Sequence, residues 1–146
     1  MTAMLSADVK IDTMSVHLPR QIVNQILSHV QTDEAREVCG LIAARNGIPC
    51  RCHPISNIAE RPAVRFVMDP AEQIDALRQM RNAGEELFAI YHSHPGSPAQ
   101  PSSTDLQEAG YPEALYLIVS LSTRGVLEMR GYYIGDGRVE ETALEL

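Results

Sequence analysis

Basic residues are scarce in this chain. Twelve lysines and arginines stand against 19 aspartates and glutamates, which gives a formal net charge of -7 and a pI near 5.1. Nucleic-acid affinity rests on basic side chains that displace counterions from phosphates. We therefore expect no nucleic-acid partner. The acidic excess is typical of a solvated surface, and it could also steer a basic partner towards a binding site.

Long hydrophobic runs are also missing. The best apolar segment, from Ala114 to Leu121, is too short to span a bilayer. The first twenty residues mix charged side chains with short apolar pieces, so they lack the apolar core of a signal peptide. We expect no membrane association and a cytoplasmic location.

Cysteine is limited to three residues, an odd number that suits a reducing compartment better than a disulfide scaffold. Cys50 and Cys52 form a lone C-x-C, a weak zinc signal without a second pair, and small strand residues are the favoured interpretation. Cys39 could act as a nucleophile with a histidine. Its apolar setting, VCGLIAA, instead favours a buried, inert thiol.

The composition is otherwise that of an ordinary globular protein. Apolar residues make up 45% of the 146 residues and charged residues 21%, without repeats or low-complexity tracts. A chain of this length buries one core, so residues 1–146 are expected to form a single domain.

The first half predicts a helix, a hairpin and a second helix. Apolar residues recur at helical spacing after Pro19. VCGLIAAR and IPCRCHPIS flank Asn46-Gly47, a pair that favours a two-residue hairpin turn. Asp69-Pro70 with Glu72 indicates a capping box at the start of the second helix, and Gly84 is its stop.

The second half predicts strands. LFAIYHS and ALYLIVSLS are typical of buried strands, and VLEMRGYYI with RVEETALEL flanks Gly135-Asp136-Gly137 as a terminal hairpin. The predicted fold class is α/β or α+β, with a mixed β-sheet covered by helices.

One stretch, YHSHPGSPAQPSSTD, begins at Tyr91 and carries the chemistry. A strand alternates its faces, so His92 and His94 project to the same side and could bind one metal ion. Pro95 cannot donate to the sheet and should end the strand there. Pro98 and Pro101 stiffen the following loop in extended geometry.

The residues after this loop could complete a metal site. Ser102 to Thr104 are helix-capping types, and residues 105–109 could form a short helix stopped by Gly110, presenting the Asp105 carboxylate from its first turn. Two histidines and one aspartate leave a tetrahedral zinc with an open position for water. Zinc lowers the pKa of such a water towards about 7.

Each half of this pattern has a simpler interpretation. Ser102 and Asp105 match a capping box, and an H-x-H on an apolar strand is commonly a packed pair of histidines. The spacing, the shared strand face and the proline exit are separate requirements. Their coincidence favours a metal site.

Amide hydrolysis also needs a base that returns its proton to the leaving amine. Glu37, beside the apolar VCGL strand, is one candidate. From the residues alone it competes with other acidic residues, namely Asp33, Glu34, Glu60, Glu72, Glu85 and Glu86.

The combination of Glu37, His92-x-His94, Ser102 and Asp105 resembles the JAMM (MPN-plus) motif of metallopeptidases. The resemblance also covers EVCGLI, RFVMDPAE and ALYLIVSL. It implies a JAMM/cytidine-deaminase-like fold and one catalytic Zn²⁺ with a bound water. It also implies that His92, His94 and Asp105 are the metal ligands, that Glu37 is the general acid/base, and that Ser102 helps to hold the oxyanion.

The short stretches between Glu37 and His92 and after Asp105 leave little room for the extra loops of chain-specific deubiquitinases. The chain most resembles small prokaryotic members of the CysO-cysteine peptidase type. This implies hydrolysis after the C-terminal Gly-Gly of a ubiquitin-like sulfur-carrier protein, with release of cysteine for cysteine biosynthesis. Closely similar proteins instead trim a carrier's tail. A homo-oligomer is compatible with the sequence.

Two other functions are less consistent with the sequence. A non-catalytic MPN-type binding module would use the HSHP loop as a recognition surface, but pure binding needs no base such as Glu37. A zinc deaminase would need H-x-E and P-C-x-x-C strings, and neither occurs.

Overall fold

The structure is a computed structural model that describes residues 15–122 and 125–146. Its helices are α2 (Arg20–Val30), α3 (Pro70–Asn82) and α4 (Ser103–Glu108). The strands are β1 (Val16–His17), β2 (Cys39–Arg45), β3 (Ile48–Ile55), β4 (Glu86–His94), β5 (Leu115–Ser120), β6 (Glu128–Gly135), β7 (Arg138–Thr142) and β8 (Leu144–Glu145).

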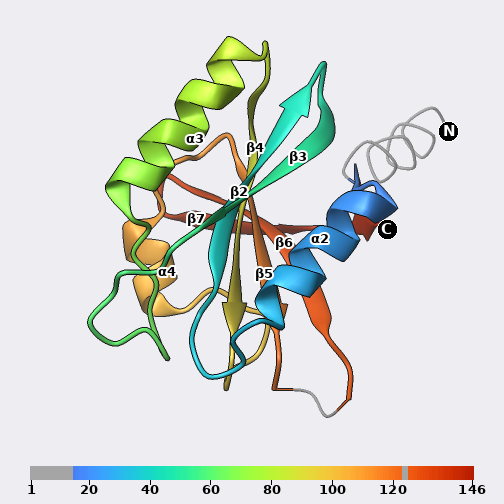
Figure 1. The fold of residues 1–146 in the computed structure, drawn as a ribbon. Helices are drawn as coiled ribbons and strands as arrows, with labels where there is room; N and C mark the ends of the chain where they lie inside the picture. Colours follow the sequence, from blue (N-terminus) through green and yellow to red (C-terminus); the bar gives the residue numbers. More distant parts are fainter. Residues whose placement is uncertain (1–14, 123–124) are drawn as a thin grey trace, which may run out of the picture.

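Six strands form one mixed sheet in the order β3-β2-β4-β5-β6-β7. The β4–β5 pair is parallel, and the other pairs are antiparallel. Helix α2 lies on one face of this sheet, while α3 and α4 lie on the other (Figure 1). The predicted mixed sheet flanked by helices is confirmed.

The central strands β2, β4 and β5 are buried on both faces, which explains why they are almost continuously apolar. Alternate residues of β4 and β5 pack into two hydrophobic clusters, one on each face of the sheet, where the sequence predicted one core. Ile90 and Ile118 face the core that contains Ala76 and Met80 of α3. Residues of the opposite parity, such as Leu117, pack against α2. The strand β4 therefore lies in the middle of the molecule, where its orientation is firmly fixed.

Both predicted hairpin turns are confirmed. Asn46 and Gly47 have φ values of 53° and 78°, and Asp136 and Gly137 have 52° and 70°. Two consecutive residues with positive φ form the tight turn that matches the twist of antiparallel strands. The β2–β3 and β6–β7 pairs therefore have the expected connections.

Two local predictions were wrong. The Asp69 carboxylate caps α3 by accepting from the amides of Ala71 and Glu72, but Glu72 does not close a capping box. Its carboxylate accepts instead from the Ser56 amide, which ties α3 to the end of β3.

The last predicted strand is split at Ala143. Its second part, β8, leaves the main sheet and pairs in parallel with β1. The expectation about a signal peptide concerns mainly residues 1–14, which lie outside the described residues. Within the described ranges, the structure contains no helix long and apolar enough to cross a membrane.

Candidate metal centre

The two histidines of the H-x-H string lie at the end of β4, on the face covered by α3 and α4. Their exposed fractions are 1% for His92 and 2% for His94. Ser93 points to the other face, where its hydroxyl accepts from the Val38 amide (2.8 Å). Because β4 ends at His94, just before Pro95, the chain leaves the sheet where the sequence predicted.

The loop after β4 is held by hydrogen bonds as well as by its prolines. The Tyr132 hydroxyl donates to the Ala99 carbonyl (2.6 Å), and the Ser120 hydroxyl donates to the Ser97 carbonyl (2.7 Å). His94 Nδ1 lies 2.8 Å from the Pro98 carbonyl, so it can act as a donor and leave Nε2 for a metal. This fixed loop delivers the start of α4 to the histidines.

Helix α4 begins with the capping box that was the simpler interpretation of this sequence. Ser102 Oγ accepts from the Asp105 amide (3.0 Å), and Asp105 Oδ2 accepts from the Ser102 amide (2.9 Å). The same Oδ2 lies 3.1 Å from Nε2 of His92 and 3.1 Å from Nε2 of His94. The capping interaction therefore aims this carboxylate at both imidazoles.

Strand register brings Glu37 to the same place. Cys39 of β2 pairs with His92 of β4, and the antiparallel direction places Glu37, two residues earlier, beside His94. One donor atom from each of Glu37, His92, His94 and Asp105 lies within 4.8 Å of the others. Glu85, one of the competing acidic residues, instead forms ion pairs with Arg45 and Arg51.

The pKa shifts of these four residues indicate a site that a bound cation or a shared proton would stabilise. Burial raises the pKa of Glu37 to about 7 and lowers that of His92. Burial also opposes ionisation of Asp105, but hydrogen bonds from the two histidines outweigh it and hold the Asp105 pKa far below its ordinary value. The same partnership outweighs burial at His94 and raises its pKa.

The residues present fit a transition-metal ion. Two imidazole nitrogens and a carboxylate oxygen are a common donor set for catalytic zinc, although other first-row ions accept it too. Glu37 Oε1 is buried and has no hydrogen-bond partner in the part of the chain that the structure describes. A buried acceptor of this kind is costly unless a proton, a water or a cation satisfies it.

Sequence comparison identifies the family that carries this arrangement. The family described as prokaryotic homologs of the JAB domain matches residues 19–132. The chain belongs to this family. The resemblance to JAB/MPN proteins and the fold that it implied are therefore confirmed.

Curated relatives of this JAB-family chain carry peptidase names. The CysO-cysteine peptidase of Mycobacterium tuberculosis (strain ATCC 25618 / H37Rv) is 38% identical over 122 residues, covering 82% of this chain and 83% of the relative. The desampylase of Haloferax volcanii is 38% identical over 103 residues, covering 66% and 74%. The solution structure of protein DSY2949 from Desulfitobacterium hafniense is 31% identical with a TM-score of 0.78, covering 88% and 90%.

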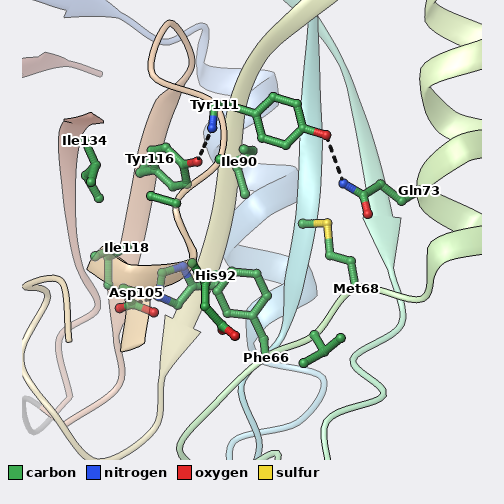
Figure 2. Close-up of a pocket in the computed structure, with 14 residues that line it drawn as sticks. Phe66, Met68, Gln73, Ile90, His92, Asp105, Tyr111, Tyr116, Ile118 and Ile134 are labelled. Atoms are coloured by element: carbon green, nitrogen blue, oxygen red, sulfur yellow. Dashed lines mark hydrogen bonds and ion pairs between the residues drawn. The ribbon is translucent and has the colours of Figure 1, made fainter. Parts of the chain in front are cut away.

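A cavity of about 260 Å³ opens beside the metal-ligand candidates of the JAB domain. His92 and Asp105 line it together with apolar side chains from the sheet and from the segment before α3 (Figure 2). Two hydrogen bonds, from the Tyr111 amide to the Tyr116 hydroxyl and from Gln73 to the Tyr111 hydroxyl, join its walls. A mostly apolar hollow beside ionisable groups is a common form of substrate site.

Some residues around the centre were missed by sequence reasoning. Phe66 stacks on His92, and Asn57 hydrogen-bonds the Glu37 backbone. Arg65 forms an ion pair with Glu108, so the segment before α3 is joined to α4. Only the string RFVMDPAE, quoted for the family resemblance, pointed to this segment.

The cysteines play no part in the cluster. Cys39 is fully buried, and burial, reinforced by the nearby Glu37 charge, raises the pKa of its thiol to about 12. This supports the prediction of an inert thiol. Cys50 and Cys52 lie in β3, and among the described residues neither belongs to a group that could hold a metal.

Proposed function

We propose that this chain is a zinc metallopeptidase of the JAMM type. Its substrate would be the amide or isopeptide bond after the C-terminal Gly-Gly of a small ubiquitin-like sulfur-carrier protein. The observation that carries the proposal is the buried carboxylate of Glu37, which lies within 4.8 Å of a His-His-Asp set and whose Oε1 has no hydrogen-bond partner among the described residues. The peptidase and desampylase names of the relatives support the same reaction class.

Each side chain of the centre has a role that fits its surroundings. His92, His94 and Asp105 would hold the ion. Zinc in that position supplies Lewis acidity towards a carbonyl oxygen and a water that ionises near neutral pH. Glu37, with a pKa near 7 in its buried position, can take a proton from the attacking water and return it to the leaving amine.

Ser102 can support the oxyanion. Its oxygen accepts the Asp105 amide hydrogen, which leaves its own O–H free to donate. A preorganised donor of this kind stabilises negative charge that develops on the substrate oxygen. The oxyanion role of Ser102 is therefore compatible with its role as a helix cap.

The cavity beside His92 is where we place the carrier's tail. The edge strands β3 and β7 are separated from β4 by other strands, so a tail added to either sheet edge would lie away from the centre. An extended chain could instead run through the cavity. Glycine at its end would allow close approach of the substrate backbone to the metal ligands.

The leaving group defines two forms of the proposal. Release of free cysteine would place the protein in cysteine biosynthesis, as the name of the mycobacterial relative suggests. Cleavage of a carrier from a protein lysine would match a desampylase. We favour the carrier-cysteine adduct, because the greater share of the chain matches the CysO-cysteine peptidase relative.

The test is direct incubation of zinc-loaded protein with a panel of Gly-Gly carriers bearing either a C-terminal cysteine or an isopeptide-linked lysine. Mass spectrometry should detect a carrier that ends in Gly-Gly together with free cysteine. No cleavage across the panel by zinc-loaded protein would overturn the peptidase proposal. Tight carrier binding in the same samples would then favour the non-catalytic binding module.

A further inference from the structure

The backbone of Glu37 is held from outside the sheet. Its amide donates to the Pro62 carbonyl (2.7 Å), and its carbonyl accepts from Asn57 Nδ2 (2.9 Å). Both partners belong to residues 57–68, which we call the flap segment. This segment closes on itself through an isolated bridge between Asn57 and Met68 and a hydrogen bond from the Ile58 amide to the Val67 carbonyl (2.8 Å).

Asn57 uses its whole amide group in this contact. Besides the Glu37 carbonyl, Nδ2 donates to the Arg65 carbonyl (3.0 Å). Oδ1 accepts from the amides of Val67 (2.9 Å) and Ala59 (3.0 Å). Two carbonyls on one side and two amides on the other fix the orientation of the side chain and satisfy it completely.

The flap segment is also in contact with the metal-ligand candidates. Phe66 lies between Arg65 and Val67, both of which hydrogen-bond the Asn57 side chain, and its ring stacks on His92. Figure 2 shows the Phe66 ring alongside His92, next to Asp105. Asn57 therefore joins the backbone of the candidate base to the wall that packs against a candidate ligand.

We propose that Asn57 is a positioning residue that sets the Glu37 carboxylate relative to the metal ligands. On the other side of Glu37, Val38 is held by Ser93 of β4. The base is thus fixed between two anchors, one in the sheet and one in the flap segment. Misplacement of a catalytic group by about 1 Å can cost on the order of 100-fold in rate.

The catalytic part of this inference rests on the proposed peptidase function, but the hydrogen-bonded contact does not. Two variants separate the parts. Asn57→Asp is isosteric and keeps the two acceptor bonds to Ala59 and Val67, while it loses both donors. Asn57→Ala loses all four bonds without adding charge. Glu72→Ala is the matched control, because it removes a hydrogen bond at the base of the same segment that does not involve Glu37.

Kinetics with the cleaved carrier should show a specific loss. Both Asn57 variants should lower kcat at least tenfold, with KM within about threefold of wild type and zinc still at one per chain. The control should keep kcat within twofold. A positioning role would be overturned if zinc content fell as much as kcat. It would also be overturned if kcat fell only in the Asn57→Asp variant.

A second measurement needs no substrate. Amide hydrogen exchange of the Glu37 N–H should accelerate at least tenfold in both Asn57 variants and remain unchanged in the control. Unchanged exchange in the variants would overturn the proposal even if a carrier is cleaved. If wild type cleaves no carrier but Glu37 exchange responds as expected, the peptidase proposal fails and the contact stands. If neither variant folds, hydrogen exchange of the wild type alone still tests the proposal. The Glu37 and Val67 amides should then be equally protected from exchange, and unequal protection would overturn the proposal.

Discussion

Phe66 stacks on the imidazole of His92, with ring centroids 4.5 Å apart and ring planes inclined by 29°. The contact covers a candidate metal ligand with an apolar ring from a segment distant in sequence. It restricts rotation of the imidazole and keeps one of its faces from water. Such support around a metal ligand tunes both its orientation and its affinity for the ion.

Replacing Phe66 with alanine should therefore weaken zinc binding. A stacked aromatic pair is worth about 0.5–1.5 kcal/mol, so we expect a loss of roughly 2–10-fold in zinc affinity. Competition with a chromogenic chelator measures this directly. Phe88→Ala is the control, because Phe88 packs against the opposite core. A comparable loss in the control would assign the effect to general destabilisation.

Removing the Ser102 hydroxyl should affect both the helix and the reaction. Ser102→Ala loses the N-cap of α4, which costs about 0.5–2 kcal/mol of stability. Loss of an oxyanion donor should also lower kcat by about 10²–10³-fold. Ser102→Thr keeps the hydroxyl and should retain most of the activity. Full activity in Ser102→Ala would refute the oxyanion role.

Glu37 should make metal-free protein sensitive to pH. Because burial raises its pKa from 4.5 to about 7, the folded chain holds a proton that the unfolded chain has lost in that range. The free energy of unfolding should therefore fall as pH rises from about 4.5 to about 7, by up to about 3 kcal/mol. Urea denaturation with a chelator present, at pH 5 and pH 8, measures the change.

Glu37→Gln isolates this effect. The His94 pKa is raised and the His92 pKa is lowered, so the two histidines change the pH dependence of the free energy of unfolding in opposite directions. They are present in both wild type and the Gln variant. The Gln variant lacks the Glu37 contribution, so its free energy of unfolding should fall less than that of wild type between pH 5 and pH 8. It should also bind zinc but lose turnover by about 10²–10⁴-fold. Identical pH slopes would contradict the buried, protonated carboxyl.

Gly40 should be intolerant of a side chain. A Cβ at this position would collide with the ring of Tyr91, which is fully buried on the neighbouring strand. Overpacking of this kind costs about 1–3 kcal/mol. Urea denaturation of Gly40→Ala should show that loss. Gly96→Ala should be nearly neutral, because among the described residues none beyond its two chain neighbours has a heavy atom within 4 Å of the added Cβ.

Much of the centre follows from local rules. Alternation along a strand places His92 and His94 together, and proline ends the strand after them. Capping chemistry places Asp105 at the start of a helix. These inferences need only neighbouring residues, and the structure confirms each placement. The two-residue turns at Asn46-Gly47 and Asp136-Gly137 follow from the same kind of rule.

The rest depends on contacts between distant segments. Residues alone could not choose Glu37 over its competitors, because the choice depends on the register between β2 and β4. Phe66 and Asn57 lie in a segment without periodicity, so no pattern marks them. Glu72 matched a capping-box position, but the nearby Ser56 amide competes for its carboxylate. The family resemblance selected Glu37 as the base, and only the structure revealed that Asn57 and Phe66 pack around the centre.

The four residues of the centre come from the approach to β2, the end of β4 and the start of α4, so no single segment of the chain contains the centre. A nascent or partly folded chain cannot assemble them. Metal affinity thus reports completed folding, and bound zinc would stabilise only the finished fold. For a peptidase this arrangement is a safeguard, because hydrolytic activity would arise only when the tertiary structure is complete.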